Sequence, residues 1–288
     1  MKYLKTILSR ILIILPDKLL NYFVFTMRQC YFPNISNPKS LNEKILHIKL
    51  YDKNPLRALV ADRLKVRKYV VTKSNDVKFP KILWKGINFS SDDWFNLPNN
   101  FILKANHGSG MIYFVDKRKD SYKAIKSLIE KWLEKNYANV SRERFYNRVE
   151  KFILAEEILK LNETIPPDYK FFCFNGKVKF VQVDLDRFEK HTRNIYNKNF
   201  EKIDVKLLYP NGIDIQRPSN FNLGLKIAEE LSSDFDFIRV DLFLLDTGVF
   251  FGEMTNTPGG GFEKFSPKIF DFKMGNELFL NKKLYERI

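Results

Sequence analysis

The spacing of apolar residues predicts helices mainly in the first half of the chain. Residues 41–51 carry apolar side chains at helical intervals, and Ser40 precedes them with Glu43 three positions later, an arrangement called a capping box. A second helix is expected from Pro55 to about Val71, because proline is favoured in a first helical turn. Apolar stripes of the same period predict two more helices, over residues 121–137 and 221–231.

Runs rich in aromatic and β-branched residues predict three hairpins and a separate strand. The strongest hairpin signal is Asn175-Gly176, because both residues tolerate the positive φ of a tight turn. The expected strands cover residues 100–106, 111–115, 151–158, 168–174, 177–184 and the two arms of 237–256. Residues 78–92 are expected to form a strand and connections, and the polar residues 185–220 an irregular segment. The length of 288 residues leaves room for one large domain or two or three packed lobes.

The last hairpin brings two carboxylates face to face. If residues 246–248 form a three-residue loop, Asp241 lies opposite Glu253 and Arg239 lies opposite Thr255. Like charges facing across a ladder destabilise a hairpin, so the pair indicates a cation between the two acids. Mg²⁺ is bound by one or two carboxylates together with substrate phosphates. An exposed acidic pair is the alternative, and a one-residue slip of the register would separate the acids.

Composition points to a folded chain that attracts anions. Hydrophobic residues make up 44% of the sequence, enough for a sizeable core. The net charge of +15 favours contact with nucleic acid, acidic lipid, nucleotide or acidic glycan, although lysines spread over solvated faces would give the same total. Cys30 and Cys173 lie far apart and indicate neither a disulfide framework nor a zinc site, so a reducing, cytoplasmic compartment is expected.

The first 30 residues are basic and apolar. Their apolar run is shorter than the 20 or so residues that span a bilayer, and Arg10 interrupts it. No small-residue cleavage site follows, as a signal peptide would require. Two interpretations remain open: peripheral contact with an anionic membrane, or a helix packed on the body of the protein.

Lys104 and the turn that follows it have the composition of a phosphate-binding loop. Lys104 lies in an expected strand, and His107, Gly108, Ser109 and Gly110 form the turn directly after it. Glycines let backbone N–H groups approach an anion, and lysine adds a point charge. The pattern is neither a dinucleotide-binding nor a Walker loop, and a glycine turn that binds nothing is the alternative.

Several further polar groups are candidates for ligand binding. Glu156 and Glu157 end a strand and could accept hydrogen bonds from an amine or a ribose, or be surface acids. Asp168 and Lys170 share a strand face, for which an exposed ion pair is the alternative. The expected loop after residue 185 supplies the candidate substrate-binding residues Arg187, His191 and Arg193, and solvent exposure is the alternative for them. No local signature of a Ser–His–Asp site, an RNA-binding motif or a zinc finger is present, so no nucleic-acid partner is expected.

In their order along the chain, these segments resemble the TupA-like ATP-grasp family of teichuronopeptide, capsule and surface-polysaccharide gene clusters. The resemblance covers most of the chain beyond residue 40. Its most specific stretches are PDYKFFCFNGK at residues 167–177 and the RVD, GE and PG blocks within residues 237–261. Two departures are visible. The Glu-x-Asn pattern of the broader fold is replaced by Glu253, Met254, Thr255 and Asn256, and Arg63 stands where a lysine often follows an aspartate.

The resemblance implies an α+β ATP-grasp fold with ATP between two lobes of mainly antiparallel sheet. It assigns residues 1–95 to an N-terminal helical region, 96–152 to the small lobe and 153–288 to the large lobe. Lys104 would contact phosphates beneath the loop 107–110, and Arg63 would be a further cofactor-binding residue. The remaining assignments it implies are adenine at Ala155, Glu156 and Glu157, ribose at Asp168 with Lys170 nearby, Mg²⁺ at Asp241, Glu253 and either Thr255 or Asn256, and charge stabilisation at the reacting carbonyl by Arg239.

A protein of this kind is expected to be an ATP- and Mg²⁺-dependent carboxylate–amine ligase that forms an acyl phosphate. The setting of the family suggests an acidic sugar or polysaccharide precursor and an amine or amino acid as substrates. Two other functions remain open: a glycosyltransferase of polysaccharide biosynthesis, which also uses acids and a metal, and a non-catalytic protein that binds polyanions or membrane through its positive charge.

Overall fold

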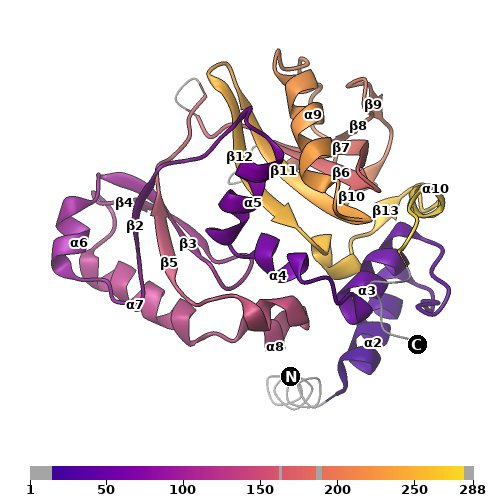
Figure 1. The fold of residues 1–288 in the computed structure, drawn as a ribbon, viewed down its shortest axis with the longest axis horizontal. Coiled ribbons are helices and arrows are strands. Elements are labelled where there is room, and N and C mark those ends of the chain that lie inside the picture. The colour runs from indigo at the N-terminus through magenta and orange to yellow at the C-terminus, as the bar shows by residue number, and fades with distance from the viewer. Residues whose placement is uncertain (1–14, 162–163, 186–189, 282–288) are drawn as a thin grey trace.

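The computed structural model describes residues 15–161, 164–185 and 190–281. Two sheets dominate it (Figure 1): a four-stranded sheet in the order β2-β5-β3-β4 and a seven-stranded sheet in the order β1-β12-β11-β6-β7-β8-β9. β10 (Lys206–Leu207) and β13 (Phe265–Ser266) form a separate pair. The expected α+β fold with two lobes of mainly antiparallel sheet is confirmed, because only the pairing of β1 with β12 is parallel among the strand pairs of the described residues.

The smaller lobe is built on the four-stranded sheet. Its strands are β2 (Ile82–Gly86), β3 (Asn100–Ala105), β4 (Ile112–Asp116) and β5 (Ile153–Glu156), and its helices are α6 (Ser91–Asn96) and α7 (Tyr122–Glu134). Apolar residues of α7, including Ile125 and Ile129, pack on Leu103 and form a core of their own. The sheet therefore extends beyond the expected limits of 96–152 at both ends. β5 joins the sheet by pairing with β3, and β2 joins it by pairing with β5, which nothing local in the sequence reveals.

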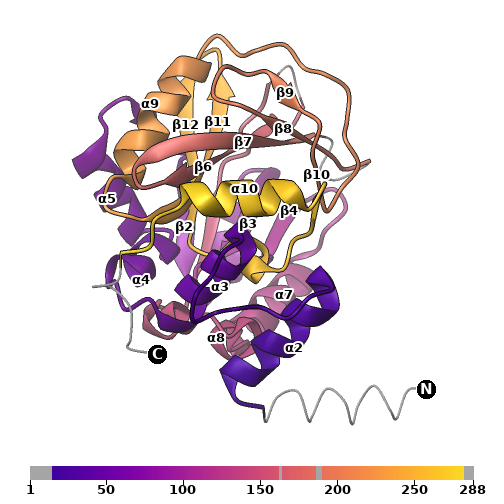
Figure 2. The same cartoon turned by 90° about the vertical axis from the view of Figure 1, so that its right-hand side faces the viewer.

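The larger sheet has apolar layers on both faces. Its strands are β1 (Val77–Lys78), β6 (Asp168–Phe174), β7 (Lys177–Leu185), β8 (Thr192–Tyr196), β9 (Lys202–Ile203), β11 (Phe237–Leu245) and β12 (Gly248–Thr255). Phe171 and Cys173 of β6 pack in the core that contains α9 (Phe221–Ser232). Phe172 and Phe174 pack in a second core with α3 (Leu41–Tyr51) and α10 (Ile269–Glu277), the helices seen against the sheet in Figure 2.

The described residues also form four further helices and two 3₁₀ turns. These are α2 (Asp17–Gln29), α4 (Leu56–Ala61), α5 (Lys65–Lys73), α8 (Tyr137–Ser141) and the 3₁₀ turns η1 (Arg144–Arg148) and η2 (Pro258–Gly261). The capping box before α3 is present as predicted, with Ser40 and Glu43 bonded reciprocally. No described helix combines the length and the apolarity that crossing a bilayer would need.

The helix expected from Pro55 to Val71 is broken in two. Asp62 ends α4, and its Oδ1 accepts hydrogen bonds from the backbone N–H of Leu64 and Lys65, 3.0 Å each, at the start of α5. An aspartate used in this way competes with helix continuation, as short polar side chains often do. The break leaves Arg63 outside both helices. The segment 185–220 also differs from the expectation, because β8 pairs with β7 and leaves less of it irregular.

The hairpin of β11 and β12 reaches the expected pairing by a different route. Its turn is shorter than predicted, since Leu245 pairs with Gly248 rather than with Val249. A β-bulge at Gly252 then inserts one residue, and beyond it Asp241 faces Glu253 and Arg239 faces Thr255. A Cβ on Gly252 would lie 2.8 Å from the carbonyl oxygen of Asp241, so the bulge requires glycine.

Candidate functional site

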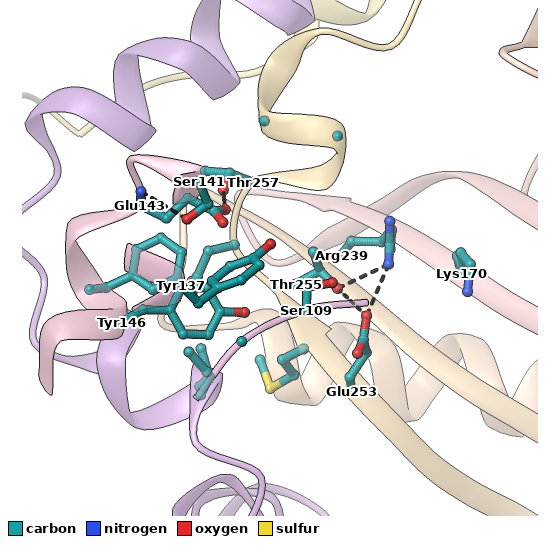
Figure 3. A pocket seen from close by; sticks show the side chains of 18 of the residues that line it. Ser109, Tyr137, Ser141, Glu143, Tyr146, Lys170, Arg239, Glu253, Thr255 and Thr257 are labelled. Atoms are coloured by element: carbon teal, nitrogen blue, oxygen red, sulfur yellow. Dashed lines mark hydrogen bonds and ion pairs between the residues drawn. The ribbon is translucent and has the colours of Figure 1, made fainter. Parts of the chain in front are cut away.

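A cavity of about 720 Å³ lies between the two sheets and is lined by residues of both lobes. This volume is in the range of pockets that bind small molecules and cofactors. The small lobe contributes Lys104 and the glycine turn, and the large lobe contributes the β11–β12 hairpin. Figure 3 shows Arg239, Glu253 and Thr255 at one end, and Glu143 and Thr257 at the other.

The two facing acids of the hairpin are bridged by Arg239. Its guanidinium donates to both carboxylate oxygens of Asp241 at 2.7 Å, and its Nη2 also donates to Glu253 Oε1 at 3.2 Å. The Thr255 hydroxyl donates to the same Glu253 oxygen at 2.9 Å. Asp241 is buried, whereas the Glu253 side chain is 35% exposed. A cation between the two acids, as the sequence pattern predicts, is therefore present: it is the guanidinium of Arg239, which lies in β11 together with Asp241.

Neighbouring strands extend this charged row across the sheet. Lys170 of β6 pairs with Asp241 across the ladder, and its Nζ lies 3.1 Å from Asp241 Oδ2 and in contact with Asp168. Asp184 of β7 lies 3.8 Å from the same Nζ and is bound by Arg193 at 2.6 Å. Asp168 and Lys170 are thus both buried, and the exposed-pair interpretation of these two residues is wrong.

The surrounding cations lower the pKa of Glu253 and of Asp184, whereas burial raises the pKa of Asp241. Burial alone would raise the pKa of Glu253, but the positive charges of Arg63, Arg239 and Lys170 lower it to about 2. The pKa of Asp184 is lowered as well, because Lys170 and Arg193 outweigh the effect of its burial. Ionised oxygens are thus present at neutral pH.

Four charged residues line the cleft where the lobes meet. Lys104 of β3 binds Glu156 of β5 through a contact of 2.6 Å, and Arg67 of α5 binds the other oxygen of Glu156 at 2.7 Å. Arg63 donates from its backbone to Asn106 and from its Nε to the Ala105 carbonyl, which places its guanidinium 3.7 Å from Glu253. Lys104, Arg63 and Arg67 therefore bring three positive charges to one wall of the cavity.

The glycine turn lies beside Tyr137 at the mouth of the cavity. A Cβ on Gly108 would come within 2.6 Å of the Tyr137 ring, and Gly110 has a φ of +74°, so both positions favour glycine. Gly108 and Ser109 line the cavity. The His107 side chain faces the core instead, where its Nε2 hydrogen-bonds the Trp132 carbonyl at 2.8 Å. Its place as a ligand-binding side chain is therefore not supported.

The family model described as TupA-like ATPgrasp matches residues 43–279. The chain belongs to the TupA-like ATP-grasp family. None of the curated proteins compared with the chain matches it. Two similar solved structures are the D-alanine–D-alanine ligase of Bacillus anthracis complexed with ATP (13% identity, TM-score 0.44, covering 75% of this chain and 60% of that one) and VanG D-Ala:D-Ser ligase of Enterococcus faecalis (15%, 0.45, 74% and 57%). A third is the ATP-grasp ligase PsnB with a minimal precursor, Mg and ADP (9%, 0.41, 70% and 52%). The chain thus spans about 60% or less of the length of these proteins.

Within this ATP-grasp chain, the departure after Glu253 is clarified by the side-chain directions. Asn256 donates to the Arg57 carbonyl at 2.9 Å and accepts from the Arg57 guanidinium at 3.4 Å, so both ends of its amide are engaged. Thr255 instead bonds Glu253 directly. The bulge lies before Glu253 and not after it. Of the two alternatives, the geometry favours Thr255 over Asn256 as the neighbour of Asp241 and Glu253.

The donor set at this end fits the Mg²⁺ that an ATP-grasp fold implies. Asp241 and Glu253 supply carboxylate oxygens on one face, and Thr255 supplies a hydroxyl, all of which suit a hard cation. Within the described parts of the chain, no three His, Cys, Asp or Glu side chains form a ready-made metal cluster. Asp241 and Glu253 would therefore bind the ion together with ligand oxygens, through acceptor sites that their contacts with Arg239 leave open.

The remaining residues expected at the site are spread around its edges. Ala155 is buried in β5, and Glu157 accepts a hydrogen bond from the Lys81 backbone at 2.8 Å, beside the passage between the lobes. His191 Nε2 lies 3.3 Å from Asp184 in the cavity wall that Arg193 also lines. Arg187 lies outside the described residues.

Several residues of the cavity were missed by reasoning from sequence. Arg67 follows Arg63 by four positions, and this basic spacing at the start of a helix could have indicated it. Lys49, Tyr137 and Glu143 come from three separate segments, and no motif singles out any of them.

Proposed function

We propose that the protein is an ATP-dependent carboxylate–amine ligase. The observation that carries this proposal is that Glu253, which faces Asp241 across the hairpin, lines one cavity together with Lys104, Arg63 and Arg67. Lys104, Arg63 and Arg67 lie where polyphosphate charge would need compensation. Glu253, whose pKa is lowered, and Asp241, which faces it across the hairpin, supply carboxylate oxygens suited to the Mg²⁺ that accompanies a nucleotide.

The proposed reaction has two steps. An oxygen of the substrate carboxylate attacks the γ-phosphorus of ATP, the bond to the β–γ bridging oxygen breaks, and ADP leaves. The amine nitrogen then attacks the acyl carbon of the acyl phosphate, the C–O bond to phosphate breaks, and the nitrogen gives up a proton. Mg²⁺, when bound, would supply neutralisation of phosphate charge.

The residues of the chain act in this reaction by orientation and charge. Lys104 is presented by a strand and held by Glu156, and Arg239 is fixed by two hydrogen bonds to Asp241. Rigid cations of this kind lower a barrier because they need no reorganisation as negative charge develops. Arg239 is assigned to the charge on the reacting carbonyl, and Ala155, Glu157 and Asp168 to the nucleoside.

We place the reaction in surface-polysaccharide biosynthesis, in the cytoplasm, with an acidic sugar as the carboxylate and an amino compound as the amine. The support is the setting of the family to which the chain belongs, together with a net charge that favours acidic substrates. Arg193 and His191, in the wall beyond Lys170, are assigned to the acidic substrate, and Arg187 joins them from the sequence.

The decisive test measures ADP release from Mg-ATP with a panel of uronic acids crossed with amino acids. We expect Glu253→Gln and Lys104→Met to lower turnover at least a hundredfold, because one positioned electrostatic group is worth about 2.7–4 kcal/mol. The exposed residues Glu134 and Lys135 provide matched controls, Glu134→Gln and Lys135→Met, with unchanged turnover. Near-normal turnover in either cavity variant, or stabilisation by a UDP-sugar but not by Mg-ATP, would contradict the ligase.

We also propose a peripheral contact of residues 1–30 with anionic membrane. The described part of this segment supports it, because Leu19, Phe23 and Met27 recur every four residues of α2 and are 53–67% exposed. Co-sedimentation with phosphatidylglycerol vesicles should be at least tenfold weaker in Phe23→Asp, and equal sedimentation of the two proteins would refute the contact. If the chain binds the vesicles but does not bind Mg-ATP, the result would favour the non-catalytic alternative.

A further inference from the structure

The end of the cavity opposite the acidic hairpin holds a buried carboxylate. Glu143, just after α8, is 8% exposed and lines the cavity. It accepts a hydrogen bond from the Thr257 hydroxyl, and the Tyr137 and Ser141 hydroxyls also bond it. No cation lies within 4 Å of its oxygens among the described residues. Burial raises its pKa, so its negative charge is poorly compensated by the protein.

A buried ammonium group lines the same region. Lys49, near the end of α3, is 7% exposed, and its Nζ lies 4.8 Å from the centre of the Phe262 ring. No carboxylate lies within 4 Å of this Nζ in the part of the chain that the structure describes. Burial lowers the pKa of Lys49 to about 8, although Glu143 and Asp17 oppose this shift. The cavity thus contains a buried cation and a buried anion that attract each other but, among the described residues, form no direct ion pair with each other.

This arrangement differs from the other end of the cavity. There Arg239 binds Asp241 and Glu253 directly, and the pKa of Glu253 is lowered because its charge is compensated. An unpaired buried charge costs far more than a paired one, so a protein rarely keeps two of them without a ligand to satisfy them. Apolar groups complete this end, namely the rings of Tyr146 and Phe262 and the α2 side chains Leu20 and Val24.

We propose that this end of the cavity binds the amine substrate and that this substrate is a free amino acid, with its ammonium group on Glu143 and its carboxylate on Lys49. A zwitterion satisfies both buried charges at once, which neither a simple amine nor a simple acid would do. The inference rests on the proposed ligase function and names the amine of that reaction.

The position of Tyr137 connects this amino-acid end with the reaction centre. Its phenol hydrogen-bonds with Glu143 and Ser109. Burial is the main cause that raises its pKa to about 12, and the negative charges of Glu143 and Glu253 add to the shift. Figure 3 shows Tyr137 and Tyr146 between the Glu143 group and the Glu253 group. An amine held by Glu143 is therefore in the same cavity as the groups that would hold the activated carboxylate.

The experiment uses isothermal titration of the full chain. Mg-AMP-PNP is titrated first, and the twenty common amino acids are then titrated singly into the complex. The best-bound amino acid is compared with its N-acetyl derivative and with the amine that lacks its carboxylate. We expect both analogues to bind at least tenfold more weakly, a difference of about 1.4 kcal/mol.

Two variants of the site and two controls complete the test. Glu143→Gln and Lys49→Met keep side-chain size and should weaken amino-acid binding at least tenfold, while Mg-AMP-PNP binds within twofold of the unmodified chain. Glu134→Gln and Lys135→Met should change neither affinity. Thermal melting shows whether each variant is folded. If a site variant does not fold, the binding of the two analogues to the unmodified chain decides the test.

The outcomes separate this inference from the proposed function. Binding of Mg-AMP-PNP without binding of any amino acid would overturn the inference and leave the ligase proposal intact. Equal binding of the N-acetyl derivative, or unchanged affinity in both folded site variants, would also overturn it. Failure of the unmodified chain to bind Mg-AMP-PNP would overturn the proposed function and the inference together.

Discussion

Arg239 lies between the two acids of the hairpin and holds both through one nitrogen. The sequence indicated that Asp241 and Glu253 face each other, because the alternation of a strand and the length of a turn decide which residues share a face. It did not indicate that Arg239, two positions from Asp241, would turn toward that pair. The directions of side chains depend on packing from other segments, here on Lys170 and Arg63.

Asp271 is a buried acid that affects stability rather than the site. It is 1% exposed at the start of α10, and its Oδ1 accepts a hydrogen bond from the Asn42 backbone at the start of α3. Burial raises its pKa from 3.8 to about 6, although that hydrogen bond opposes the shift. Between these two pH values the folded state holds a proton that the unfolded state has lost. The contribution of Asp271 to stability therefore falls as the pH rises from about 4 to about 6.

We predict that Asp271→Asn removes this pH dependence. The free energy of unfolding of the variant, relative to the unmodified chain, should rise by about 2–3 kcal/mol between pH 4 and pH 7, from 1.36 kcal/mol for each pKa unit. Urea unfolding of both proteins at the two pH values measures this difference. A relative stability that is the same at pH 4 and pH 7 would show that Asp271 is not a buried acid of raised pKa.

At the scale of elements, the bulge in β12 decides where the acids point. The predicted three-residue turn was wrong, because the turn is one residue shorter. The predicted pairs at the site are present all the same, because the extra residue Gly252 in β12 shifts the register back by one. Without the bulge, the two-residue turn would have shifted Glu253 to the opposite face of the sheet. A bulge next to a functional residue is a common way to aim one side chain.

Gly252→Ala should therefore damage the site as well as the strand. Its new Cβ would meet the Asp241 carbonyl at 2.8 Å, which we expect to lower stability by about 1–3 kcal/mol and to weaken Mg-AMP-PNP binding at least tenfold. Gly224→Ala in α9 is the matched control, because its Cβ would meet the Leu244 side chain at 2.9 Å in the core between α9 and the sheet, and not the backbone of the bulge. Nucleotide affinity equal in both variants would show that the bulge does not position Glu253.

Elements fixed by local chemistry were predicted well, and those fixed by distant contacts were not. The capping box at Ser40, the Asn175-Gly176 hairpin and the helix from Phe221 all need only neighbouring residues, and all are present. The break at Asp62 was missed because it is stabilised partly by Asn106, which accepts a hydrogen bond from the backbone of Arg63 at the turn after β3. β8 was missed because its polar residues Arg193 and Asn194 are buried against partners far along the chain, which makes them resemble a loop in sequence.

At the scale of the whole molecule, the small lobe has an apolar core that is separate from the cores of the large sheet. Its apolar core shares no residue with the cores of the large sheet. Polar contacts such as Arg67–Glu156 and Arg63–Ala105 join it to the rest across the cleft. The three tryptophans, Trp84, Trp94 and Trp132, all belong to this lobe. Tryptophan fluorescence therefore reports on the small lobe, whereas circular dichroism reports on both.

We predict that the two signals separate when the ligand-free chain is unfolded with urea. The fluorescence transition should come at a lower urea concentration, because the smaller core buries less apolar surface. Mg-AMP-PNP, which would bind both lobes, should move the fluorescence transition toward the urea concentration of the circular-dichroism transition. Coincident transitions without ligand would show that the lobes unfold as one unit.

The limits of the lobes themselves could not be predicted from the sequence. The family resemblance placed a boundary near residue 96, but β2 pairs with β5 more than 60 residues away, and β1 pairs with β12. Both pairings join segments that are distant in sequence, and no local signal reveals such partners.

The pairing of β1 with β12 links the chain that enters the small sheet to the strand that carries Glu253. Residues 79–81 lead directly from β1 into the small sheet, and Lys81 is bonded on both sides to Glu157, where the chain returns. The two passages thus form a short double-stranded hinge, anchored at Val249 and Phe250 on the strand that carries Glu253. If the small lobe tilted over a bound ligand, we would expect this hinge to pull on β12, so that the position of Glu253 would change together with the position of the lobe.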